Sequence, residues 1–197
     1  TVTNAVVLQA NTPLRVSNRV GPTNLLASAI TDGGSGFGIT KVGEGTLRLG
    51  GSNTYGGVTT VSAGRLQVDG YQAGLGAFTV ASNAALWGTG VVSAAATVQG
   101  GGTLGQLTPV TNGLLTIGSL TLASGARVEA ILRGTNPTVR TTGNLGSSAG
   151  VSVAVLPLGP LSTGTHVLVD YNGSFVGAIG DDSLTAIPNG GQGELVQ

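Results

Sequence analysis

Short apolar runs recur along this chain, and glycine, asparagine and serine interrupt them at close intervals. The segments 46–49 and 65–68 alternate apolar and polar residues with a period of two, which is typical of a strand with one buried face. The residues expected on that buried face are Leu47, Leu49, Leu66 and Val68. The runs are too short for helices, which need roughly 10–12 residues with a period of 3.6. The pattern therefore predicts an all-β chain of short strands.

An apolar pair recurs every 18–20 residues. The pairs are Val42 and Leu47, Val61 and Leu66, Val80 and Leu86, Val98 and Leu104, and Ile117 and Leu122. A second interpretation of the last unit takes Leu122 and Val128 as its pair. A repeat of this length is typical of a solenoid, so we expect a parallel β-helix of about five turns. Its core would contain a column formed by Leu47, Leu66, Leu86 and Leu104.

The composition agrees with a coil that has many tight corners. Glycine accounts for 36 of the 197 residues, well over twice its average share of about 7%, and it supplies the positive φ angles that tight corners need. The chain is 40% hydrophobic, which argues against disorder. No apolar run approaches the roughly 18 residues of a membrane-spanning helix, and no signal-peptide pattern opens the chain.

Charge is sparse and balanced, with eight basic and eight acidic residues. Nucleic acid would favour a clustered basic face, so we expect no nucleic-acid partner. The chain has no cysteine, which fits a protein that crosses an oxidising periplasm unfolded and fits a cytosolic protein equally well. With one histidine and no cysteine, we expect no transition-metal site and no cofactor.

The segment 39–68 carries small, apolar and polar residues at fixed spacings. They are Lys41, Gly43, Gly45, Thr46, Leu47, Leu49, Gly51, Asn53, Tyr55, Gly57, Thr59, Val61, Gly64, Leu66 and Val68. Their order resembles the autotransporter-associated β-strand repeat, whose pattern reads roughly LxKxGxGTLxLxGxNxYxGxTxVxxGxLxV. The segments 84–92 and 97–106 resemble further turns of that family, and 113–176 is similar to the C-terminal part of pertactin-like passenger domains.

The resemblance implies a passenger of type V secretion, a right-handed parallel β-helix exported across the outer membrane of a Gram-negative bacterium. It implies that the C-terminal turns act as an autochaperone, which nucleates folding at the cell surface. It also implies a partner, an outer-membrane barrel absent from this chain, since no ten-residue segments of alternating lipid-facing residues follow Phe175. We expect β-helix turns over 1–110, and further turns with an autochaperone-like cap over 111–197.

An asparagine–glycine pair lies between two apolar-rich runs near the C-terminus. Asn172 and Gly173 separate 166–171 from 174–179, and such a pair is the strongest short-range signal for an antiparallel hairpin. We therefore expect a hairpin containing Asn172, Gly173 and Phe175 in the cap, where it would cover the open end of the coil.

Three polar groups have the residue types of a chemical site. His166 and Asp170 would lie on one strand face about 13 Å apart, too far for a catalytic hydrogen bond. Asp181 and Asp182 are adjacent and would face opposite ways, which favours solvated charges over a calcium site or a glycosidase pair. Asp32 and the glycines after it resemble one copy of a calcium-binding repeat, but those sites share ligands between copies, so we favour a flexible corner. We predict no catalytic and no metal-binding residue.

Two aromatic side chains have two interpretations each. Tyr55 occupies an aromatic position of the repeat, where a corner residue usually packs on the neighbouring turn, and Trp87 follows a strand of the next unit. A carbohydrate platform is the alternative for both. Only seven aromatic residues occur in the chain, so we favour packing for Tyr55.

Two classes of function remain. The first is a non-enzymatic stalk and autochaperone of a cell-surface or secreted passenger, which serves adhesion or virulence and meets a host surface protein or glycan. The second is a fragment of a β-helical polysaccharide-acting enzyme, or of an anchored bacterial surface protein without a barrel. Such enzymes place several charged side chains on one groove of the coil, whereas the acidic residues here are scattered. We therefore favour the first class.

Overall fold

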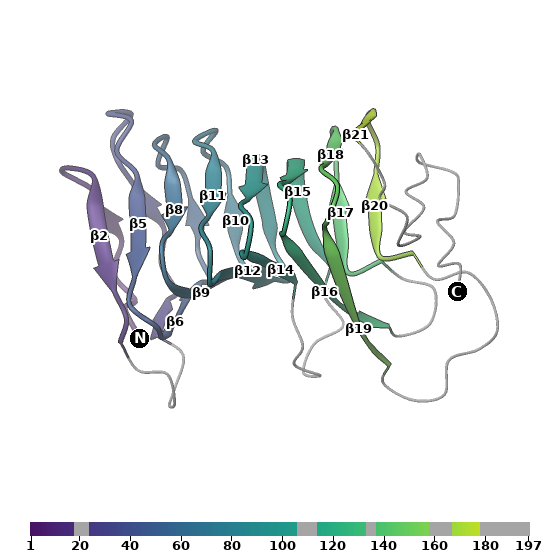
Figure 1. The fold of residues 1–197 in the computed structure, drawn as a ribbon. Helices are drawn as coiled ribbons and strands as arrows, with labels where there is room; N and C mark the ends of the chain where they lie inside the picture. Colours follow the sequence, from purple (N-terminus) through teal and green to yellow (C-terminus); the bar gives the residue numbers. More distant parts are fainter. Residues whose placement is uncertain (18–23, 106–113, 133–136, 158–166, 178–197) are drawn as a thin grey trace.

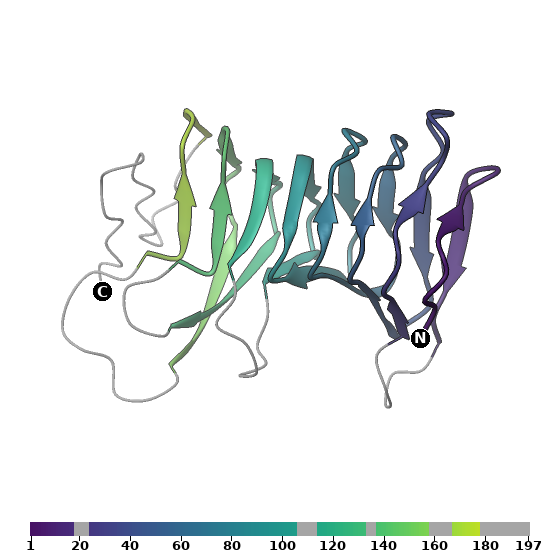
Figure 2. The same ribbon diagram turned by 180° about the vertical axis from the view of Figure 1, so that it is seen from behind.

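The computed structural model describes residues 1–17, 24–105, 114–132, 137–157 and 167–177. These residues form 21 short strands and no helix, so none of them belongs to a helix that could cross a membrane. Every strand pair among them is parallel. The strands stand side by side in chain order, from purple β2 to yellow-green β20 (Figure 1), and the reverse view shows the same succession (Figure 2). The prediction of an all-β parallel β-helix is confirmed.

One wall of the coil is a seven-stranded sheet, here called wall A. Its strands, in spatial order, are β3 (Asn24–Leu26), β6 (Thr46–Leu49), β9 (Gly64–Val68), β12 (Ala84–Gly88), β14 (Thr103–Gly105), β16 (Arg127–Leu132) and β19 (Ser152–Pro157). Spatial order follows sequence order because each turn adds one strand beside the previous one.

Two further walls share the large sheet. Wall B contains β2 (Thr12–Arg15), β5 (Ile39–Val42), β8 (Thr59–Val61), β11 (Phe78–Val80), the second halves of β13 (Val91–Val98) and β15 (Leu115–Leu122), β18 (Leu145–Ser147) and β21 (Phe175–Gly177). Wall C contains β7 (Ser52–Asn53), β10 (Tyr71–Gln72), the first halves of β13 and β15, β17 (Val139–Thr141) and β20 (Val169–Tyr171). At the N-terminal end β1 (Val6–Val7) pairs with β4 (Ile30–Thr31).

The coil has eight turns at wall B, more than the five expected. Paired residues in this wall are 20, 19 and 18 positions apart between Ile39 and Ala96, but 24, 25 and 30 apart between Ala96 and Phe175. The later turns were missed because their longer connections break the 19-residue period. Parallel pairing continues on both sides of residue 110, and the division of the chain at that point stays a prediction.

The leucine column of wall A lies where the repeat predicted it. Leu47, Leu66, Leu86 and Leu104 are paired in register and at most 3% exposed. Val128 continues the column opposite Leu104, and Leu122 pairs with Val98 in wall B. The second interpretation of the last repeat unit is therefore correct.

The first repeat unit needs a different correction. Val61, Val80 and Val98 form one column of wall B, but the residue that pairs with Val61 is Lys41, not Val42. The strand β5 alternates with Lys41 inward and Val42 outward. The predicted register was one residue off because a buried lysine breaks the apolar pattern.

The expected hairpin at Asn172 and Gly173 is wrong. The strand β20 before the pair runs parallel to β17, and β21 after it runs parallel to β18. The amide of Asn172 donates to the Thr141 carbonyl at 3.1 Å, and the amide of Gly173 donates to the Gly143 carbonyl at 3.0 Å. Stacking on the corner of the previous turn therefore overrides the local preference of the pair for an antiparallel turn. Phe175 begins a strand of the coil.

Candidate functional site

The predicted repeat residues divide into a buried core and a set of corners. The core residues Leu47, Leu49, Val61, Leu66 and Val68 are at most 3% exposed and belong to one apolar cluster that runs through the coil. Each buried Leu or Val side chain stabilises a fold by about 1.5–3 kcal/mol relative to an exposed one. The core column is thus the main source of cohesion between turns.

The repeat glycines lie where the backbone of one turn touches the next. A Cβ atom added at Gly57 would lie 2.3 Å from the carbonyl carbon of Phe37, and one added at Gly51 would lie 2.3 Å from the carbonyl oxygen of Ser28. Gly64 has a φ of 65°, whereas no positive φ marks Gly45, Gly51 or Gly57. Glycine at Gly51 and Gly57 is therefore required by close approach, not by the left-handed backbone expected from composition.

Asn53, Tyr55 and Thr59 form the polar part of the repeat and are all buried. The Asn53 side-chain oxygen accepts from the amide of Ile30 at 2.8 Å, which links two turns. The Tyr55 hydroxyl and the Thr59 Oγ1 are hydrogen bonded at 2.7 Å. Burial raises the pKa of Tyr55 to about 12. The Tyr55 ring is 3% exposed, so it packs inside the coil and offers no platform to a sugar.

Lys41 is a key residue to which the sequence assigned no role. Its side chain is fully buried, and its Nζ donates to the carbonyl oxygens of Val42 at 3.2 Å, Gly43 at 2.5 Å and Ala63 at 3.0 Å. Ala63 belongs to the next turn, so the ammonium group joins two corners. Desolvation lowers the pKa of Lys41, against an opposing effect of Glu44. The signal was the lysine position in the repeat pattern, which periodicity treats as surface.

The corner that begins at Asp32 is ordered by that carboxylate. Asp32 is 3% exposed and accepts hydrogen bonds from the amides of Gly34, Gly36 and Phe37, and from Gly56 of the next turn at 3.1 Å. These amides, with Gly56 first, lower the pKa of Asp32. The interpretation as a flexible corner is therefore wrong, because a buried carboxylate with four amide donors fixes the loop. Within the described ranges, no three His, Cys, Asp or Glu side chains lie close enough to hold a metal ion.

The outer face of wall A carries Trp87 and a cluster around Asp69. The guanidinium carbon of Arg65 lies 5.5 Å from the Trp87 ring centroid, a cation–π contact. The Asp69 carboxylate accepts from Arg48 Nε at 2.5 Å, from Gln67 at 2.8 Å and from the amide of Thr89 at 3.1 Å. Trp87 is half-buried, so part of its ring is covered, as in the packing interpretation.

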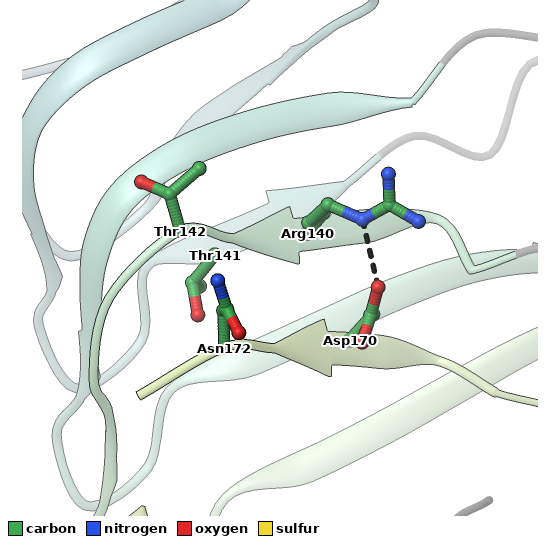
Figure 3. A pocket seen from close by; sticks show the side chains of 5 residues that line it. All are labelled: Arg140, Thr141, Thr142, Asp170 and Asn172. Atoms are coloured by element: carbon green, nitrogen blue, oxygen red, sulfur yellow. Dashed lines mark hydrogen bonds and ion pairs between the residues drawn. The ribbon is translucent and has the colours of Figure 1, made fainter. Parts of the chain in front are cut away.

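A pocket of about 360 Å³ lies over walls C and B near the C-terminal end of the described chain. We call it the outer pocket; its lining residues are Arg140, Thr141, Thr142, Asp170 and Asn172 (Figure 3). Arg140 on β17 and Asp170 on β20 face each other in register, and Arg140 Nε donates to Asp170 Oδ2 at 2.7 Å. The sequence had considered Asp170 only as a partner of His166, which lies outside the described residues, as do Asp181 and Asp182.

Comparison with known proteins gives two matches. Residues 39–68 match the model of the passenger-associated-transport-repeat. A segment of 46 residues, 23% of this chain, is 52% identical to the adhesin BmaC autotransporter of Brucella suis biovar 1 (strain 1330). The matched segment covers 1% of that adhesin, so this chain spans only a small part of the length of its relative.

The matched repeat coincides with the part of the coil where the turns are most alike. It runs from the start of β5 to the end of β9 and contains the core column, the close glycine corners and the buried Lys41, Asn53 and Tyr55. The repeat at residues 39–68, the adhesin match and the parallel β-helix together identify this chain as autotransporter passenger sequence.

Proposed function

We propose that this chain is the C-terminal stalk and autochaperone part of a passenger exposed on, or secreted from, a Gram-negative cell. In this proposal its last turns fold first, outside the cell, and the coil grows from them toward the N-terminus. The stalk then supports adhesion and virulence. The match to an adhesin supports the adhesive setting, and the partners are an outer-membrane barrel and a host surface protein or glycan.

The observation that carries this proposal is the unbroken parallel pairing from β2 to β21. Each strand in such a ladder offers its free backbone groups and its inward side chains as a template for the next strand. A turn that folds beside an existing one gains hydrogen bonds and an apolar layer together. A lone turn gains neither, so folding that begins at one end and propagates is the favoured route.

The C-terminal turns have a feature that suits them to fold first. Tyr171 is 1% exposed and is the largest fully buried side chain. Its ring centroid lies 6.3 Å from that of Phe175, with the planes tilted by 47°. Aromatic pairs in this geometry contribute about 0.5–1.5 kcal/mol beyond their burial. An aromatic pair within one turn gives that turn cohesion of its own, before any neighbour is present.

The test compares two buried tyrosines at opposite parts of the coil. We expect Tyr171→Leu to slow refolding from urea in proportion to its destabilisation, with a φ-value above about 0.5. The matched variant Tyr55→Leu is expected to act mainly on unfolding, with a φ-value below about 0.3. Equal φ-values, or the reverse order, would contradict nucleation at the C-terminal turns.

Truncation provides a second measurement. Deletion of 136–197 removes β17 to β21, and we expect residues 1–135 to refold slowly and incompletely. Deletion of 1–38 removes β1 to β4, and the remaining residues should refold as fast as the whole chain. Prompt and complete refolding of 1–135 would exclude the autochaperone role.

A further inference from the structure

We propose that the outer pocket binds a neutral sugar through two adjacent hydroxyl groups. The proposal deepens the adhesive part of the proposed function, because it names a ligand class and the residues that take it. It does not depend on the autochaperone role. The outer pocket lies on solvent-facing side chains of β17 and β20, away from the core column.

The hydrogen-bonding groups of the pocket form a complementary set. Arg140 uses its Nε for Asp170 Oδ2, and its two terminal amino groups point away from Asp170 (Figure 3). Within the described chain these amino groups and Asp170 Oδ1 have no further partner. A sugar hydroxyl can therefore accept from Arg140, and its neighbour can donate to Asp170, so that one diol spans the pair.

The amide of Asn172 lies beside the ion pair and extends the set of polar groups toward the corner. Thr142 Oγ1 donates to the carbonyl of Gly118 at 3.3 Å, and Thr141 Oγ1 donates to the carbonyl of Gly143 at 3.1 Å. These two hydroxyl groups are engaged within the protein. The ligand contacts are thus assigned to Arg140, Asp170 and Asn172.

The balance of charge favours a neutral ligand. An anion that approaches Arg140 meets the Asp170 carboxylate, which already lies 2.7 Å from the guanidinium. A cation that approaches Asp170 meets Arg140 in the same way. A neutral diol leaves the ion pair in place and adds hydrogen bonds to charged groups, which are the stronger kind.

The volume of the pocket fits a small saccharide. At about 360 Å³ it lies at the lower end of the range of about 300–1,000 Å³ that small-molecule sites occupy. The lining is polar and no aromatic residue belongs to it. We therefore expect weak binding, with a Kd on the order of 1 mM.

The ion pair adds little to the stability of the coil, which makes it suitable for substitution. The side chains of Arg140 and Asp170 are 48% and 23% exposed, and pairs of this kind typically contribute about 0–1 kcal/mol. A matched pair exists on wall A, where Arg127 and Glu129 are 47% and 19% exposed with an N–O distance of 3.1 Å. Variants of Arg127 control for a general loss of surface charge.

The experiment is a titration of the ¹⁵N-labelled full chain with methyl β-galactoside and methyl α-mannoside, followed by amide chemical shifts. We expect saturable shifts confined to 139–142 and 169–172 with at least one of the two sugars. Arg140→Gln and Asp170→Asn should each raise the Kd at least tenfold, and Arg127→Gln should leave it unchanged.

Three results would overturn the proposal. The first is no saturable shift at about 100 mM of either sugar, roughly a hundred times the expected Kd. The second is tighter binding of N-acetylneuraminate, an anionic sugar, than of both neutral sugars. The third is an equal loss in Arg127→Gln. None of these results bears on the refolding measurements, so failure of the pocket and failure of the autochaperone role are distinguishable.

Discussion

The turns of residues 39–90 and those of 114–177 solve the same packing problem in different ways. In the first region successive turns repeat every 18–20 residues, and glycines bring the corners into backbone contact. In the second region the repeat lengthens to 24–30 residues while the strands remain in register. Wall strands therefore fix the coil, and corner length is free wherever the corners are not packed on one another.

The interiors of the two regions differ as well. Residues 39–90 combine aliphatic columns with the buried polar side chains Lys41 and Asn53, which bind corner carbonyl and amide groups. In the C-terminal turns the largest buried side chain is Tyr171, paired with Phe175. The first region is held by contacts between turns, whereas the second adds a contact within one turn.

The largest expected effect comes from the glycine corners. Gly57→Val places a Cβ 2.3 Å from the backbone of Phe37, so the two turns must separate; we expect a loss of about 4 kcal/mol in the free energy of unfolding, at the severe end for a point substitution. The matched control is Gly146→Val in β18, where the nearest atom is 3.5 Å away. Urea unfolding measures both, and equal losses would remove the distinction between packed and free corners.

Lys41→Met should have the next largest effect. Methionine retains most of the volume but leaves three buried carbonyl groups without their donor, and we expect a loss of about 3 kcal/mol. Arg127→Met on the exposed face of β16 should change stability by less than about 0.5 kcal/mol. If Lys41→Met proves as stable as the wild type, the ammonium group does not join the corners.

Tyr55 gives the first region a dependence on alkaline pH. Its folded pKa is about 12, above the ordinary value of 10.0, so the folded state retains the proton that the unfolded state loses. Stability is fully present below pH 10 and falls as the pH rises toward 12, by about 2.7 kcal/mol in all. In Tyr55→Phe this fall should be absent from urea unfolding midpoints measured between pH 9 and 11.5.

Lys41 contributes to the same profile with the opposite sign. Its folded pKa is lowered by desolvation, so between that value and 10.5 the unfolded state binds more protons and stability rises with pH. The rise should disappear in Lys41→Met and persist in Tyr55→Phe. A profile that both substitutions leave unchanged would mean that neither group titrates differently in the two states.

The smallest expected difference concerns two aspartates on the outer surface. Asp69 receives four hydrogen bonds and its side chain is 10% exposed, so Asp69→Ala should lower stability by about 1.5 kcal/mol. Asp170 receives one and is 23% exposed, so Asp170→Ala should stay within about 0.5 kcal/mol. Thermal unfolding of the two variants side by side decides whether the surface network of the first region is the stronger.

Prediction from the sequence succeeded where side-chain periodicity reports burial. The column from Leu47 to Leu104 and the alternation of β6 and β9 follow from spacing alone, because inward positions must be apolar. It failed at Lys41, since a buried ammonium bound to three carbonyl oxygens has the same letter as a solvated one. It also failed at Asn172, where the preceding corner, 30 residues away, selects the parallel continuation.

The outer pocket marks the same limit. Arg140 and Asp170 are 30 residues apart and belong to no sequence motif, and they meet because β17 and β20 pair in register. The sequence by itself determined the all-β class, the period of the central turns and the residues of their core, because those depend on local alternation and on repeats of similar length. Only the tertiary structure decided the number of turns, the fate of the Asn–Gly corner, the role of Lys41 and the place of the pocket. Each of these depends on which backbone groups of one turn lie against the next, and that stacking depends on connections whose lengths vary while the register of the walls does not.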